Sequence, residues 1–156
     1  MTEAAACTAE AARKRALNML ARREHSCAEL RAKLAAKGFP SGIIDDALSE
    51  LHRSGWLSDE RFVAAFIRAR GERGYGPVRI RAELRERGID DELIAMHLDV
   101  HDPSWVRGLQ GLLLKRFGAR RPEDFAAKAR QMRFFQARGF SAEQIRAVME
   151  RGEDEG

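Results

Sequence analysis

In this 156-residue sequence, the two side chains whose spacing best suits metal binding are a pair of histidines. His97 and His101 are four residues apart, a spacing that places both on one face of a helix, where two imidazoles can bind one metal ion. No cysteine or carboxylate arrangement nearby completes such a site, and His25 and His52 stand much earlier in the chain. We therefore interpret the pair as surface histidines and predict neither a metal nor a cofactor.

The motifs of common enzyme classes are missing. The sequence has no GxxxxGK[ST] phosphate-binding loop and no GxSxG nucleophile motif. The carboxylate pairs Asp45-Asp46 and Asp90-Asp91 stand at predicted helix starts, where negative charge complements the helix dipole. We expect a binding protein with no catalytic residues rather than an enzyme.

Arginine placement is the chemistry that remains. In one arginine-rich helix, Arg79, Glu83 and Arg87 form a chain of opposite charges four residues apart. Arg81 and Arg85 lie on another stripe with no acidic residue three or four positions away. Such a stripe suits a phosphate backbone or an acidic protein surface, and a solvated helix face is the alternative.

Positive charge is concentrated toward the C-terminus. The net charge is +4, and residues 103–152 hold eleven Arg and Lys against four Asp and Glu, whereas residues 1–102 hold seventeen of each sign. This balance permits an anionic partner without requiring one. The candidate contact residues are Lys33, Lys37, Arg70, Arg73, Tyr75, Arg79, Arg81, Arg85, Arg87, Arg120, Arg121, Lys128, Arg130 and Arg133.

The elements that position these side chains repeat about every fifty residues. Three amphipathic helices end at a basic residue followed by glycine, and we call these pairs the basic–glycine corners: Lys37-Gly38, Arg87-Gly88 and Arg138-Gly139. The glycines are 50 and 51 residues apart. A basic last turn complements the helix dipole and glycine supplies a left-handed cap. An apolar residue, a predicted N-cap (Ser41, Asp90 or Ser141) and a second amphipathic helix follow each corner. The spacing of Ser141 with Gln144, and of Ser26 with Glu29, predicts capping boxes.

A further helix precedes each of these helix pairs, at about residues 9–23, 59–73 and 104–117. The sequence thus predicts an all-α fold of nine helices in three tandem three-helix modules, 9–55, 56–102 and 103–151, stacked as an elongated, curved array. Residues 1–8 and 152–156 are expected to be disordered, and Trp56 is interpreted as an aromatic plug between modules. The predicted core positions are Leu17, Leu20, Phe62, Phe66, Ala69, Ile80, Leu84, Leu109, Leu113 and Phe117.

The Gly74-Tyr75-Gly76-Pro77 corner lies between two helices of the second module. Pro77 suits a first helical turn, and Gly74 allows a left-handed φ after the preceding helix. The corner therefore reads as a stiff joint that aims the next helix, and a phosphate loop is not needed to explain it. Tyr75 either packs against a helix or stacks on a base.

These residues resemble a known family. The stretches "LARREHSCAELRAKLAAKGF" and "GWLSDERFVAAFIRARGERGYGPVRIRAELRERGI" are similar to the first-repeat signature and the most distinctive segment of the RecX regulatory proteins. The resemblance is strong over about residues 13–100 and rests on module architecture through 103–151. Met132 and Gln136 replace Arg81 and Arg85 in the third module, so the arginine stripe does not carry over.

The resemblance implies a partner and an activity. RecX-like proteins bind the RecA recombinase, usually as a filament on single-stranded DNA, and lower its ATPase, strand-exchange and coprotease activities. Two alternatives stay open: a helical-repeat protein that competes for single-stranded or double-stranded DNA, and a helix-turn-helix transcription regulator.

Two further features bear on location. Cys7 and Cys27 are interpreted as free thiols in a reducing cytosol. No apolar run approaches membrane-spanning length. We therefore expect a cytoplasmic protein.

Overall fold

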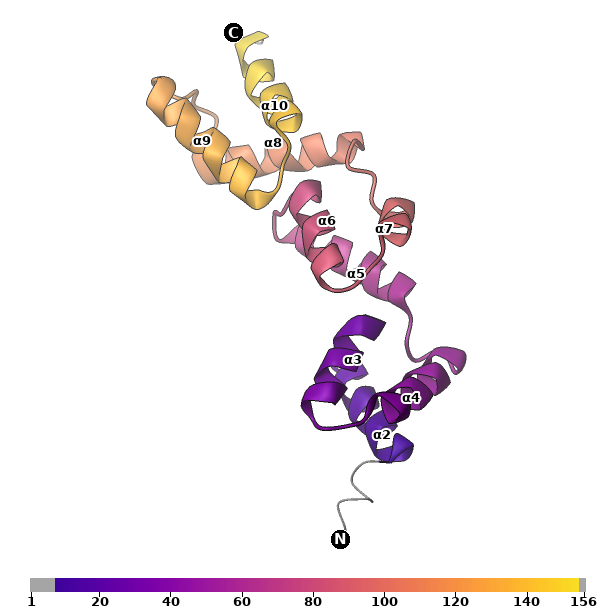
Figure 1. Ribbon diagram of the computed structural model, residues 1–156. Coiled ribbons are helices and arrows are strands. Elements are labelled where there is room, and N and C mark those ends of the chain that lie inside the picture. Colours follow the sequence, from indigo (N-terminus) through magenta and orange to yellow (C-terminus); the bar gives the residue numbers. More distant parts are fainter. Residues whose placement is uncertain (1–7, 155–156) are drawn as a thin grey trace. The chain divides into compact units, whose positions relative to one another are not determined.

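In the computed structural model, the described residues are 8–154, with side chains through Glu150, and they form helices and no strand (Figure 1). The prediction of an all-α chain is confirmed for this part. The helices are α2 (Ala9–Leu20), α3 (Cys27–Ala36), α4 (Ser41–Arg53), α5 (Asp59–Glu72), α6 (Pro77–Glu86), α7 (Asp91–His97), α8 (Pro103–Phe117), α9 (Phe125–Arg138) and α10 (Ala142–Asp154).

Two helix starts use the reciprocal capping boxes that the sequence predicts. The Ser26 hydroxyl accepts from the Glu29 amide at 3.0 Å, and the Glu29 carboxylate accepts from the Ser26 amide at 3.2 Å. Ser141 and Gln144 repeat the arrangement at 3.1 and 3.0 Å. The prediction of Ser41 as a cap is wrong, because α4 already begins at Ser41 and the extended residue before it is Pro40, whose side chain has no acceptor.

The basic–glycine corners have the predicted backbone conformation. Gly38, Gly88 and Gly139 have φ values of +95°, +81° and +100°, the left-handed region that glycine adopts without a side-chain clash. Gly74 likewise has φ +85°. The chain therefore turns at each corner because the residue there is glycine.

The chain divides into two compact units. The first unit comprises residues up to Phe66 together with Leu84–Ile94. Its core lies among α2, α3 and α4 and contains Ala12, Ala16, Leu30, Leu34, Ile44, Ala47, Leu48 and Leu51. The predicted core positions Leu17 and Leu20 are only partly buried against it, whereas Ala12 and Ala16 of the same helix are fully buried.

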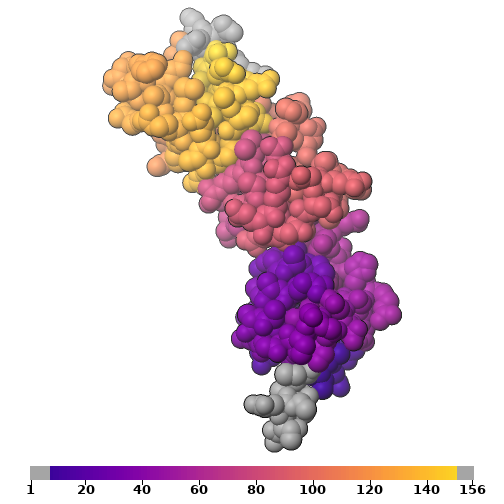
Figure 2. Space-filling model, viewed as in Figure 1, coloured from indigo at the N-terminus to yellow at the C-terminus, as the bar shows by residue number. Residues whose placement is uncertain are grey.

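The second unit comprises Ile67–Glu83 and the chain from Ala95 onward. In it, α8, α9 and α10 enclose Leu109, Phe135, Phe140, Ile145 and Val148. The orange α9 and the yellow α10 lie directly against each other in the space-filling view (Figure 2). The predicted core residues Leu113 and Phe117 pack against this cluster, and the Phe117 ring meets the Phe135 ring edge-on at 5.7 Å.

The second module contributes to both units. Ile80 and Leu84 of α6 are fully buried, as predicted. Ala69 is exposed, so its place in the predicted core is wrong. The interpretation of Trp56 as an aromatic plug between modules is also wrong, because 60% of its surface is exposed. The three module boundaries stay a prediction.

Part of the ends that the sequence predicts to be disordered belongs to helices or their caps. Thr8 caps α2, and α10 continues through Asp154. The rest of these predicted tails, 1–7 and 155–156, lies outside the described residues.

Candidate interaction surface

The Arg87-Gly88 corner sits on the start of α3 in the first unit. The Ser26 hydroxyl donates to the Arg87 carbonyl at 2.8 Å. A Cβ atom on Gly88 would lie 2.4 Å from the Ala28 Cβ, far inside van der Waals contact. The corner of one module therefore docks on the middle helix of the module before it, and glycine permits the close approach.

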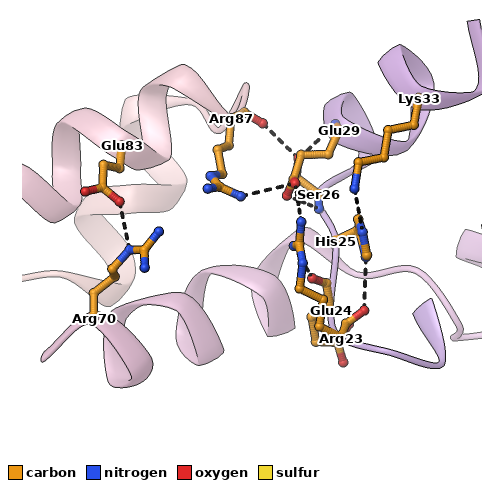
Figure 3. A network of polar contacts seen from close by, with 9 residues as sticks. All are labelled: Arg23, Glu24, His25, Ser26, Glu29, Lys33, Arg70, Glu83 and Arg87. Atoms are coloured by element: carbon orange, nitrogen blue, oxygen red, sulfur yellow. Dashed lines mark hydrogen bonds and ion pairs between the residues drawn. The ribbon is translucent and has the colours of Figure 1, made fainter. Parts of the chain in front are cut away.

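We call each contact between a docked basic–glycine corner and the helix start that receives it a joint. Glu29 lies at the electrostatic centre of the joint formed by the Arg87-Gly88 corner (Figure 3). Its carboxylate accepts from the Arg23 guanidinium at 2.9 Å and from the Arg87 guanidinium at 3.2 Å. Burial by itself would raise the pKa of Glu29, but the hydrogen bonds from Arg23 and the Ser26 amide, with the charges of both arginines, lower it overall. Glu29 thus joins an arginine of its own module to the corner of the next one.

His25 is buried beside the joint, with 3% of its surface exposed. Its Nδ1 lies 3.0 Å from the Arg23 carbonyl and its Nε2 lies 3.1 Å from the Lys33 ammonium. A carbonyl only accepts and an ammonium only donates, so the neutral tautomer with hydrogen on Nδ1 satisfies both contacts. Burial lowers the pKa of His25, and the nearby charges of Arg23 and Lys33 lower it further. Lys33 is thus engaged with the buried imidazole.

We expect His25 to make the first unit less stable in mild acid. Its pKa is lower in the folded than in the unfolded protein, so the unfolded state binds more protons and the stabilisation is lost as the pH falls below about 6.5. In the variant His25→Gln, the urea midpoint of unfolding should fall less steeply than in the wild type between about pH 7 and pH 5.

His52 supplies the matched control, since it lies exposed on α4 of the same unit. His52→Gln should keep the wild-type slope of urea midpoint against pH. Equal slopes for wild type and His25→Gln would show that the buried imidazole does not carry the acid sensitivity.

The Arg138-Gly139 corner docks in the same way on the start of α6 in the second unit. The Gly76 amide donates to the Arg138 carbonyl at 2.7 Å, and the Val78 amide donates to the Gly139 carbonyl at 2.9 Å. A Cβ on Gly76 would lie 2.6 Å from the Gly139 carbonyl, and one on Gly139 would lie 2.2 Å from the Arg79 Cβ. The Gly-Tyr-Gly-Pro corner is therefore one half of a backbone-to-backbone joint.

Tyr75 is held by arginines of this joint. The Arg79 guanidinium lies 4.3 Å from its ring centre, and the Arg138 guanidinium lies 5.0 Å from it. Both distances are within the range of cation–π attraction. The half-buried ring thus packs within the protein, which is the first of the two roles considered from the sequence.

Several of the predicted contact residues are engaged inside the protein. Arg70 and Arg79 each donate to Glu83 at 2.8 Å. Burial would raise the pKa of Glu83, but the two guanidinium groups lower it overall. The expected i,i+4 pair between Arg79 and Glu83 is confirmed, whereas Arg87 pairs with Glu29 instead.

The expectation that Arg85 has no acidic partner is wrong. Its guanidinium donates to Asp91 at 2.6 Å, six positions further along the chain. The turn at Gly88 brings the start of α7 back beside the end of α6, and a search at helical spacing overlooks such a pair. Arg81 of the same stripe forms no ion pair with the residues that the structure describes, and it is half-buried.

The remaining candidates lie mostly on the surface. Lys128 is half-buried on α9. The others are exposed and form no ion pair within residues 8–150: Lys37, Arg73, Arg120, Arg121, Arg130 and Arg133. By sequence count, the second unit holds sixteen Arg and Lys against eleven Asp and Glu, whereas the first holds twelve against thirteen. The positive excess of the chain therefore belongs to the second unit.

The described residues offer neither a metal centre nor a membrane-spanning helix. Among the described residues, no three His, Cys, Asp or Glu side chains gather as metal ligands would. No described helix is long and apolar enough to cross a membrane. Cys27 is a free thiol, and Cys7 lies outside the described residues.

Three family models match the chain in sequence order. The first three-helix domain of RecX matches residues 12–51, the second matches 58–98 and the third matches 109–149. The chain belongs to the RecX family. This confirms the resemblance and extends it through the third module, where the sequence motifs alone were weakest.

Relatives and solved structures agree with this assignment. A protein of Halorhodospira halophila named regulatory protein RecX is 44% identical over 95% of this chain and 91% of its own length. One of Pseudomonas entomophila with the same name is 42% identical over 88% and 89%. The crystal structure of RecX from Lactobacillus salivarius covers 93% of this chain and 96% of its own, with a TM-score of 0.77 at 18% identity, and so supports the fold.

Proposed function

We propose that this chain is a cytoplasmic, non-enzymatic regulator that binds the RecA recombinase on single-stranded DNA and restrains its ATPase, strand-exchange and coprotease activities. The observation that carries the proposal is the match of all three RecX domain models in order along the chain. RecA regulation is the role that the family resemblance implies.

The two joints determine which arginines of the second module's middle helix are free to contact a partner. Each joint holds a module's corner against its predecessor's middle helix by backbone hydrogen bonds, side-chain hydrogen bonds or ion pairs. Arg79 and Arg87 serve these joints, so they have less freedom to contact a partner. Arg81 lies between them in sequence and keeps its guanidinium unpaired among the described residues. We accordingly propose Arg81, of the second module's middle helix, as a contact with RecA or with DNA on the filament.

We expect Arg81→Glu to weaken inhibition of the RecA ATPase on single-stranded DNA. Loss of a hydrogen bond to a charged group costs about 1.5–3 kcal/mol, so the concentration for half-inhibition should rise about tenfold or more. The measurement is the steady-state ATPase rate of RecA titrated with the wild type or the variant. Arg53→Glu makes the same charge change at an exposed position of α4 and should inhibit like the wild type.

Competition for DNA would give a different result. In the proposed mode, inhibition survives the addition of protein-free single-stranded DNA, and the wild type is retained on immobilised RecA filaments. If added DNA titrates away all inhibition, the chain acts by binding DNA and the RecA-directed proposal is wrong. Salt dependence does not separate the two modes, because both use arginines.

A further inference from the structure

The third module carries a groove that neither joint uses. A hollow of about 260 Å³ lies between α8, the segment 118–122 and α10. A second hollow of about 190 Å³ adjoins it and shares Arg121, Pro122 and Met149. We call the two together the C-terminal groove. Its walls are mainly aliphatic and include Leu113, Leu114, Val148 and Met149.

A buried polar side chain lines this groove without a partner. Gln131 of α9 has 8% of its surface exposed and makes no hydrogen bond through its side chain to the described residues. No fully enclosed side-chain polar atom in the described part lacks a partner, so the Gln131 amide must reach the groove surface. Counted back from the corner glycine, Leu30 and Ile80 occupy the equivalent positions of the first two modules. The third module therefore places an amide where the repeat otherwise places a core aliphatic residue.

The rim of the groove is positive and partly apolar. Arg120 and Arg121 line it and form no ion pair with residues 8–150. Leu114 and Phe125 are 52% and 86% exposed, unusual values for such side chains. The Asp124 carboxylate also lines the second hollow, and it accepts from the Ala127 amide at 2.8 Å as the cap of α9.

We propose that the C-terminal groove binds an acidic segment of a partner protein that inserts one apolar side chain. The aliphatic walls would bury that side chain, the Gln131 amide would bond the segment's main chain, and Arg120 and Arg121 would meet its carboxylates. Small-molecule sites usually have about 300–1,000 Å³, so the larger hollow suits a side chain better than a whole cofactor. Among the described residues that line the groove, Phe125 is the single aromatic side chain, whereas single-stranded nucleic acids stack successive bases on several aromatic faces, which favours a peptide over a nucleotide. This inference does not rest on the proposal about RecA.

The test is fluorescence anisotropy on the full chain at physiological salt, where charges farther apart than about 8 Å are screened. The probe is a fluorescein-labelled peptide in which aspartates and glutamates flank a central leucine. We expect saturable binding that Arg120→Glu/Arg121→Glu weakens about tenfold. Gln131→Leu should weaken it about fivefold, the effect of one lost hydrogen bond. That variant should fold, because the other modules carry Leu or Ile at this position.

Arg107→Glu/Arg146→Glu is the matched control, since it makes the same charge change at exposed positions of α8 and α10 outside the groove and should alter binding less than about twofold. A peptide with serine in place of the leucine should bind about tenfold more weakly, because the apolar anchor is gone. Absence of peptide binding, or equal binding by all variants, would overturn the proposal. So would a result in which the groove variants lose affinity for labelled oligothymidylate while peptide binding stays unchanged, because the groove would then be a nucleic-acid site.

Discussion

Gly139→Ala is expected to lower the free energy of unfolding of the second unit by about 3 kcal/mol. A left-handed backbone costs a residue with a Cβ about 1–2 kcal/mol, and Gly139 has φ +100°. The new Cβ would also lie 2.2 Å from the Arg79 Cβ and 2.7 Å from the Arg79 nitrogen, so the corner must move away from α6. The two hydrogen bonds from Gly76 and Val78 would then be lost, at about 1 kcal/mol each.

Urea unfolding measures the total effect, and amide hydrogen exchange measures the joint itself. In the wild type, the Gly76 and Val78 amides donate across the joint and should exchange slowly. In Gly139→Ala, both should exchange faster even where the unit remains folded. Unchanged protection of these two amides would mean that the corner does not depend on the glycine.

Gly38→Ala is the matched control, because Gly38 has the same place in the repeat and a similar φ of +95°. A Cβ on Gly38 meets nothing within 4 Å, so this corner docks on no helix start among the described residues. This substitution should therefore cost only the backbone strain of about 1–2 kcal/mol. The difference between the two variants isolates the docking. Equal destabilisation would contradict the joint as a source of stability.

The local features of the fold could be predicted from the sequence because each is encoded within one turn of helix. Ser26 and Ser141 cap as expected, since a capping box needs only residues three apart. The corner glycines have the expected left-handed φ for the same reason. Pro40 shows the limit, because it rather than Ser41 precedes the first turn of α4, and this choice depends on how the chain leaves the preceding corner.

The joints could not be predicted, because they depend on residues far apart in the chain. The glycines at 38, 88 and 139 look alike in sequence, yet only the last two receive a neighbouring helix start. The sequence spacing places Arg87 in a chain of charges along its own helix, whereas in the structure it pairs with Glu29, 58 positions away. The burial of His25 could not be predicted either, since an isolated histidine carries no periodic signal. The C-terminal groove does leave one sign in the sequence: Gln131 stands at the repeat position that Leu30 and Ile80 fill in the first two modules.

Glu29→Ala is expected to lower the free energy of unfolding of the first unit by about 2 kcal/mol. The variant loses the reciprocal half of the capping box and the acceptor for two guanidinium groups, and the side chain is only 12% exposed. Loss of a cap costs about 1 kcal/mol and loss of a bond to a charged group about 1.5–3 kcal/mol, which is reduced here because Arg23 is 46% exposed. Glu50→Ala removes an exposed pair with Arg13 on the same unit and should cost less than about 0.5 kcal/mol.

Glu29→Gln separates the cap from the charge. Glutamine can accept from the Ser26 amide as glutamate does, so this variant should keep the cap and lose only the charge-assisted bonds, an intermediate cost of about 1 kcal/mol. The pKa of Glu29 is lower in the folded than in the unfolded protein, so its charge stabilises the fold above about pH 4.3 and this contribution disappears as the pH falls further. The urea midpoints of wild type and Glu29→Gln should therefore differ at neutral pH and converge in acid. A difference that stays constant as the pH is lowered would show that the carboxylate charge does not hold the Arg87 corner on α3.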